Sequence, residues 1–338
     1  MRTDRLKYMD IARGIGMICI ILGHLGNNGI NRVVYTFHVP LFFILAGYFI
    51  SEKKSMGGFV KSRARVLLVP YAVTCAVMIV LGIAAGIVLY GPIGVWQGIN
   101  WLWACFYGSG NSFDLIFHIK AVGAIWFLLA LFWGSILFRA SLKMNKWIRA
   151  AFAIALFAAA YFTRNVFWLP FSLQPGMCSV LFIYAGWIVK TYKTRLAAVP
   201  KAVKIACLCL AAALWGVFIA AYETFWVVRC DFGRGIPDII MCLNACLTVV
   251  FISWLLEKAP LFGTVFSLVG RYSLLILCIH NIELNFFPWT QMMNLLISRG
   301  MPSALALPLT IAGKLAGCFI AAWLLLKVGP VRKLFKYE

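Results

Sequence analysis

Apolar residues in this sequence gather into ten runs that short polar segments separate. Most runs hold about 17–25 residues, the length that an α-helix needs to cross a bilayer. The pattern predicts an all-α polytopic membrane protein, a bundle of about ten transmembrane helices. The predicted spans are residues 9–26, 34–51, 66–90, 121–140, 148–163, 173–190, 203–222, 236–256, 272–289 and 304–327.

The longest segment between two spans, residues 91–120, is not an ordinary polar loop. It carries Trp96, Trp101 and Trp103. Because tryptophan favours the headgroup level of a membrane, this stretch is predicted to be re-entrant or interfacial. No small-residue cleavage site follows the first run, so it is predicted to be a retained helix rather than a signal peptide.

Composition supports a membrane protein. Of 338 residues, 63% are hydrophobic and 12% are charged. Soluble domains carry about 25% charged residues, so a water-soluble domain and a disordered chain are both excluded. The eleven cysteines lie mostly within apolar runs, without the Cys/His spacing of a metal site. We expect packing residues and no metal, and a disulfide between Cys105 and Cys230, both in predicted external loops, stays open.

The basic residues that give the net charge of +21 lie between the predicted spans rather than along one stripe or helix. With the N-terminus inside, the inner segments hold 22 lysines and arginines and the outer segments hold 6. Cytoplasmic loops of membrane proteins carry such an excess. The distribution predicts that both termini are cytoplasmic, and it gives no indication of nucleic-acid binding.

Ionisable residues inside the first span point to function. Arg13 and His24 are eleven residues apart, so they share one face of a helix at a separation of about 16 Å along its axis. A cation at one end and an imidazole at the other suit an anionic substrate that lies along this face. Asp10, one turn before Arg13, is placed to hold its guanidinium. The structural alternative is a snorkelling arginine and a histidine that joins two helices.

Two groups of residues outside the first span are further candidates for the functional site. His38, near the outer end of the second span, could relay protons with His24, or be an inert interfacial histidine. Lys61, Arg63 and Arg65 before the third span suit either a phosphate clamp or ordinary inner-loop charges.

The ninth span begins at Arg271 and carries His280 and Glu283, which are i,i+3 neighbours. Lys314, near the middle of the last span, needs a partner, and Glu283 is the candidate. A purely structural pair is the alternative.

The motifs resemble those of the acyltransferase 3 family of membrane O-acyltransferases, and among its branches the fucose 4-O-acetylase-like one. The resemblance extends over nearly the whole chain, and the arginine-x10-histidine spacing is its most specific part. The residues that carry it are 8–16, the Arg13-x10-His24 spacing, 37–43, 46–49, 61–71, 124–128 and 268–280.

The resemblance implies an enzyme that moves an acyl group, usually acetyl, from cytoplasmic acyl-CoA to a hydroxyl of an extracytoplasmic glycan or related acceptor. It implies a multi-pass protein of a bacterial plasma membrane, with the lipid bilayer around it and a homo-oligomer left open. With acetyl-CoA as donor, His24 and His38 are the expected catalytic residues. The expected substrate-binding residues are Asp10, Arg13, Lys61, Arg63, Arg65, Trp126, Arg271, His280 and Glu283.

This sequence departs from the family pattern in two places. Ala46 stands where relatives have a serine, and no soluble C-terminal domain is expected, so residues 1–338 are predicted to be one membrane domain. Direct attack on the thioester and an acyl-histidine intermediate both remain open. The alternative function is a transporter or flippase for a lipid-linked glycan or anionic solute, whose charges would line a path.

Overall fold

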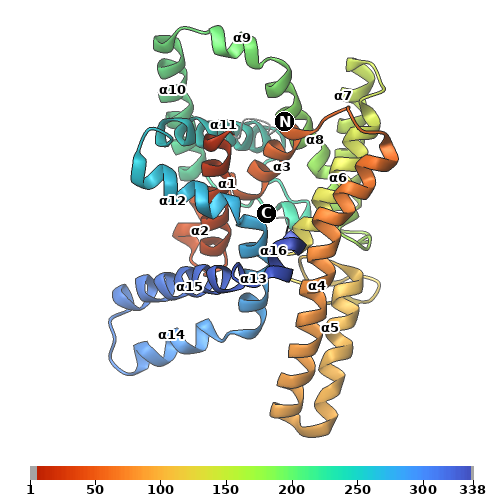
Figure 1. Ribbon diagram of the computed structural model, residues 1–338, viewed down its shortest axis with the longest axis vertical. Helices are drawn as coiled ribbons and strands as arrows, with labels where there is room; N and C mark the ends of the chain where they lie inside the picture. The colour runs from red at the N-terminus through yellow and green to blue at the C-terminus, as the bar shows by residue number, and fades with distance from the viewer. Residues whose placement is uncertain (1–5, 336–338) are drawn as a thin grey trace.

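The computed structural model describes residues 6–335 and consists almost entirely of helices (Figure 1), so it confirms the predicted all-α class. Arg2, Arg5 and Lys336, counted among the predicted inner charges, lie outside the described residues. The helices at the predicted spans are α1 (Lys7–Gly23), α2 (Asn28–Val34) with α3 (His38–Phe49), α4 (Met56–Tyr90), α6 (Trp126–Ser141), α7 (Lys146–Thr163), α8 (Leu173–Thr191), α10 (Lys201–Ala220), α11 (Ile236–Leu256), α13 (Ser273–Phe286) and α15 (Ser303–Leu325). The remaining elements are η1 (Gly91–Val95), α5 (Trp96–Tyr107), β1 (Phe113–Asp114), β2 (His118–Ile119), α9 (Lys193–Ala198), η2 (Val227–Arg229), α12 (Pro260–Arg271), α14 (Trp289–Ser298) and α16 (Gly329–Phe335).

The helices have the length and composition of a multi-pass membrane protein. Six helical segments of the described chain are long and apolar enough to cross a membrane. A seventh is added if α12 and α13, bent by 70° at their junction, form one span. Helix α10 buries only Phe218 among its 20 residues although it is strongly apolar, which is the pattern of a lipid-facing helix.

Within residues 91–120, α5 forms the second arm of a helical hairpin and η1 forms its turn. Helix α5 returns along α4 (Figure 1), and a Cβ added to Gly86 would lie 2.1 Å from the carbonyl oxygen of Gly94. Residues 121–125 are not helical, so the predicted span 121–140 begins too early. The side chain of Asn281 explains this, because it accepts a hydrogen bond from the N–H of Ile125 and donates one to the carbonyl of Val122.

Helix α1 lies among α3, α11, α12 and α13, and glycines set how closely α12 approaches it. A Cβ added to Gly14 would lie 2.0 Å from the carbonyl oxygen of Phe266. One added to Gly270 would lie 1.7 Å from the carbonyl oxygen of Asp10. Small residues of this kind let the backbones of two membrane helices touch. The contact fixes the helix that carries Arg13.

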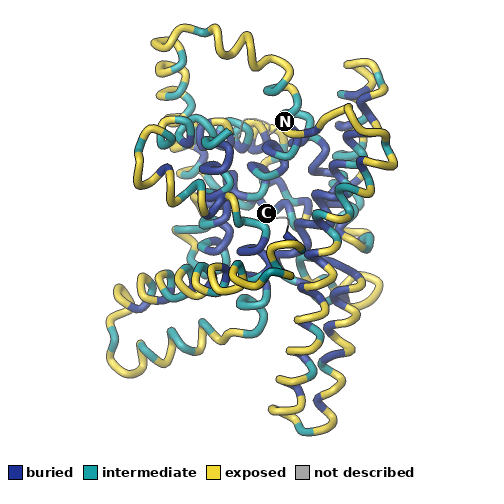
Figure 2. The backbone as a smooth tube through the Cα atoms, in the orientation of Figure 1, coloured by how far each residue is buried: buried dark blue, intermediate teal, exposed yellow. Residues whose placement is uncertain are grey.

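A second glycine contact joins α3 to α8. A Cβ on Gly47 would lie 1.9 Å from the carbonyl oxygen of Ile183, so the backbones of the two helices touch. Buried residues concentrate where these helices meet, while the α4–α5 and α14–α15 pairs project with exposed surfaces (Figure 2). All eleven cysteines are free. Cys105 lies beside Cys75, so the structure does not contain the disulfide to Cys230 that the sequence left open.

The glycine at the α1–α12 contact provides a test of this packing. Gly270→Ala should lower the free energy of unfolding by about 1–3 kcal/mol, the usual cost of overpacking, because the new methyl group overlaps a backbone oxygen. Thermal unfolding in detergent measures the change. Gly317→Ala is the matched control, since a Cβ on Gly317 meets no atom within 4 Å. Equal melting temperatures for the two variants would contradict the close contact.

Candidate active site

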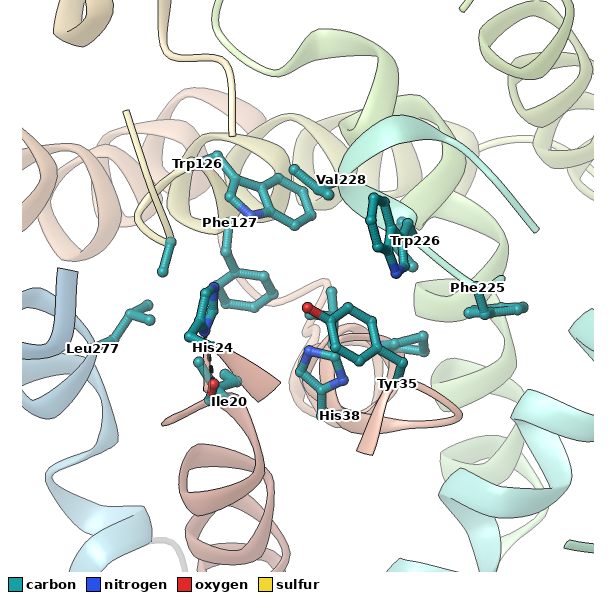
Figure 3. Close-up of a pocket in the computed structure, with 14 residues that line it drawn as sticks. Ile20, His24, Tyr35, His38, Trp126, Phe127, Phe225, Trp226, Val228 and Leu277 are labelled. Atoms are coloured by element: carbon teal, nitrogen blue, oxygen red, sulfur yellow. Dashed lines mark hydrogen bonds between the residues drawn. The ribbon is translucent and has the colours of Figure 1, made fainter. Parts of the chain in front are cut away.

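His24 lies at the C-terminal end of α1, where the helix stops. Its Nδ1 is 2.7 Å from the carbonyl oxygen of Ile20 (Figure 3). A carbonyl oxygen only accepts, so Nδ1 must carry the proton and donate it. Nε2 of His24 then keeps a free lone pair, which is the arrangement that a general base requires.

His280 on α13 stands directly behind His24. Its Nε2 is 3.3 Å from Nδ1 of His24, and the two ring centroids are 5.0 Å apart. Its Nδ1 is 2.7 Å from a carboxylate oxygen of Glu283, so this nitrogen donates to the carboxylate. The His280 side chain is fully buried. The series Glu283, His280, His24 can stabilise positive charge that forms on the His24 imidazole.

Glu283 is also paired with Lys314, as the sequence predicts. The Nζ of Lys314 is 2.7 Å from the second carboxylate oxygen, and only 2% of the lysine side chain is exposed. His280, Glu283 and Cys318 have potential ligand atoms within 4.8 Å of one another, a spacing that a metal ion could use. The ammonium of Lys314 already lies at the carboxylate, and it would repel a second cation there.

A small aromatic cavity adjoins His24 (Figure 3) and has a volume of about 60 Å³. His38 also faces it, with Nδ1 2.7 Å from the carbonyl oxygen of Val34 and its ring 4.8 Å from that of Tyr35. The lining residues come from α1 and its C-terminal end, the end of α2, α3, α6 and the turn before it, α13, and the segment before α11. They are Ile20, His24, Tyr35, His38, Val39, Pro40, Ala124, Trp126, Phe127, Phe225, Trp226, Val227, Val228 and Leu277.

A second, cationic cavity of about 310 Å³ lies further along α1. Arg13, Arg63 and Arg271 line it. Arg13 is held by Asp10, with Nη1 3.1 Å from the carboxylate, and its guanidinium stands over the ring of Phe49. Three guanidinium groups around one cavity supply the positive charge and the hydrogen-bond donors that phosphate groups require.

A third cavity, of about 350 Å³, reaches His24 from the side of α14. Its lining includes the polar side chains of Asn285, Thr290, Gln291 and Lys314, with the indole of Trp289. This composition suits a ligand with several hydroxyl groups. His24 is therefore a wall residue of both the aromatic and the polar cavity.

The family profile described as an acyltransferase domain, that of acyltransferase 3, matches residues 6–327. The chain belongs to the acyltransferase 3 family. The nodulation protein NolL of Sinorhizobium fredii is 29% identical over 243 residues, which cover 65% of this chain and 60% of NolL. The match thus spans less than two thirds of that relative's length. No solved structure matches the chain.

Family membership identifies this chain as a membrane protein of an acyl-transferring class and confirms the family resemblance seen in the sequence. The fucose 4-O-acetylase-like branch stays a prediction. The structure brings His24, His38 and Trp126 to the aromatic cavity, and His280 with Glu283 behind His24. His280 and Glu283 thus stand beside the predicted base, whereas the sequence grouped them with the substrate-binding residues.

The basic residues before the third span have different surroundings in the structure. Arg63 lines the cationic cavity, whereas Lys61 and Arg65 are exposed on other faces of α4. Arg271 supplies a third cation from the end of α12. Sequence reasoning did not identify Tyr35 and Trp226, because neither lies in a motif and only the tertiary structure brings them to His24.

The Lys314–Glu283 pair gives a prediction about stability. Lys314→Met should lower the free energy of unfolding by about 3–5 kcal/mol, because it leaves a carboxylate in the protein interior without its cation. The double variant Lys314→Met with Glu283→Gln should recover much of this loss. Thermal unfolding in detergent tests both, with Lys201→Met at the exposed start of α10 as the control. A wild-type melting temperature for Lys314→Met would contradict a structural role for the pair.

Proposed function

We propose that this protein is a membrane O-acyltransferase that takes an acyl group from cytoplasmic acyl-CoA and transfers it to a hydroxyl of an extracytoplasmic glycan. The observation that carries the proposal is the position of His24 in the wall of both the aromatic and the polar cavity, at the end of the helix whose Arg13 lines the cationic cavity. Membership in the acyltransferase 3 family supports an enzyme over the alternative of a transporter. The chain would act in a bacterial plasma membrane with both termini in the cytoplasm.

The donor fits the cationic cavity. Phosphate groups of CoA would be held by Arg13, Arg63 and Arg271, because guanidinium groups bind phosphate oxygens in a bidentate manner. The pantetheine arm would lie along α1 toward His24, over the roughly 16 Å that separates the two sequence motifs. The nucleotide would remain on the inner side while the thioester reaches the histidine.

The acceptor fits the polar cavity beside α14. A glycan presents hydroxyl groups and apolar ring faces, which match the amide and hydroxyl side chains and the indole of Trp289 that line this space. A hydroxyl placed there would lie next to His24, which lines this cavity as well as the aromatic one.

The reaction follows from the proton positions. Nε2 of His24 takes the proton of the acceptor hydroxyl as its oxygen bonds to the thioester carbonyl carbon. The carbon–sulfur bond then breaks, and the CoA thiolate receives that proton. Glu283, through His280, stabilises the imidazolium in between. The indole of Trp126 and the hydroxyl of Tyr35 are the candidate donors to the oxyanion.

Removing the imidazole tests the proposal directly. His24→Ala should reduce acyl transfer by about 10²–10⁴-fold, the usual contribution of a general base, while calorimetric binding of CoA stays within about twofold of wild type. The acylated acceptor is measured by mass spectrometry of surface glycans from cells that express each variant. His118→Ala is the control, because that histidine is exposed and lines none of the three cavities. Full acylation in the His24→Ala strain would refute the mechanism.

Two neighbouring arginines test the donor site. Arg63→Ala should weaken CoA binding by about 1.5–3 kcal/mol, the range for hydrogen bonds to charged groups, whereas Arg65→Ala should change it by less than about 0.5 kcal/mol. The two side chains have the same charge and lie two residues apart, and only Arg63 lines the cavity. Calorimetry at two salt concentrations measures both. Equal losses would place CoA elsewhere.

A further inference from the structure

The aromatic and cationic cavities are separated by one layer of side chains. Ile20, Phe127 and Leu277 line both of them, each presenting a surface to either side. These residues come from α1, α6 and α13, the same helices that carry His24, Trp126 and His280. A thioester that approaches His24 from the cationic side therefore meets this apolar wall first.

The space beyond the wall is small and apolar. Its volume of about 60 Å³ is far below the roughly 310 Å³ of the cationic cavity, so of the two spaces it is the one suited to a short acyl chain. No lysine, arginine, aspartate or glutamate is among the residues that line it. A carboxylate placed here would lose its hydration without gaining an ionic partner, which disfavours a dicarboxylic acyl group such as succinyl.

The outer wall of the cavity cannot easily retreat. A Cβ added to Gly110 would lie 2.3 Å from Trp126 and 2.5 Å from Val228, so the Gly110 backbone supports both side chains from behind. The segment that carries Val228 is closed by two backbone hydrogen bonds between Trp226 and Asp231, of 2.8 and 3.1 Å. A longer acyl chain would have to displace these tightly packed atoms.

Resting on the proposed function, we propose that the aromatic cavity is the acyl-binding pocket and that Ala124 and Val228 in its wall limit the transferred group to two carbons. The acyl methyl group would point toward these two side chains, with the carbonyl carbon at His24. In the transfer step the acceptor oxygen–carbonyl bond forms and the carbon–sulfur bond breaks. His24 carries the hydroxyl proton to the CoA sulfur, and the bonds within the acyl chain do not change.

Substitution of Val228 tests the proposed limit. Each methylene that a hydrophobic pocket admits or rejects changes kcat/KM by about 10–200-fold. Val228→Ala removes two methyl groups, so the ratio of kcat/KM for butyryl-CoA to that for acetyl-CoA should rise at least about tenfold. The purified full chain in detergent is assayed by release of free CoA from each donor. Val180→Ala is the matched control, since Val180 is buried in α8 and lines none of the cavities described.

The opposite substitution fills the pocket. Ala124→Val adds two methyl groups and should reduce kcat/KM for acetyl-CoA at least about tenfold, and calorimetric binding of CoA without an acyl group reports whether each variant is folded. An unchanged butyryl-to-acetyl ratio in a folded Val228→Ala protein would overturn the acyl pocket and leave the proposed function intact. If the wild-type protein releases CoA from no acyl-CoA, the proposed function fails as well. A rise in the ratio for Val180→Ala as large as that for Val228→Ala would also overturn the assignment.

Discussion

Lys314 and Glu283 form an ion pair between α15 and α13 in the interior of a bundle made mostly of apolar residues. Neither charge is stable there alone, because moving an ion out of water costs several kcal/mol. The pair therefore fixes the distance between the two helices and the orientation of the carboxylate. One oxygen faces Lys314, and the other is left to accept the hydrogen bond from His280.

That second oxygen determines the chemistry of the site. Because Glu283 accepts from Nδ1 of His280, the Nε2 lone pair of His280 faces His24. The carbonyl of Ile20 accepts the proton on Nδ1 of His24, which leaves Nε2 free. A buried charge on α15 is thus connected, through Glu283 and His280, to the candidate base on α1, whose tautomer the carbonyl of Ile20 sets.

The position of α1 depends on backbone contacts rather than on side-chain chemistry. Gly14 and Gly270 bring α1 and α12 together so closely that an added methyl group would overlap a carbonyl oxygen. Arg271 follows directly after this contact, and for that reason it joins Arg13 at the cationic cavity. The same helix presents Arg13 to one cavity and His24 to two others, which places the cationic, aromatic and polar cavities around a single element.

The helical class and the approximate positions of most long helices follow from the sequence alone, since apolar runs of span length have few other stable conformations in a membrane. The local pairs, Asp10 with Arg13 and His280 with Glu283, also follow from the sequence, because helix geometry alone brings residues three positions apart together.

Contacts between residues far apart in the chain depend on the tertiary structure. His24 and His280, which are 256 positions apart, are an example. The tertiary structure also decided which basic residue of α4 reaches the cavity and that Trp226 and Val228 close the space beside His24. Those outcomes depend on the packing angles and separations of helices, which small residues such as Gly47 and Gly270 set and which periodicity along one helix cannot encode.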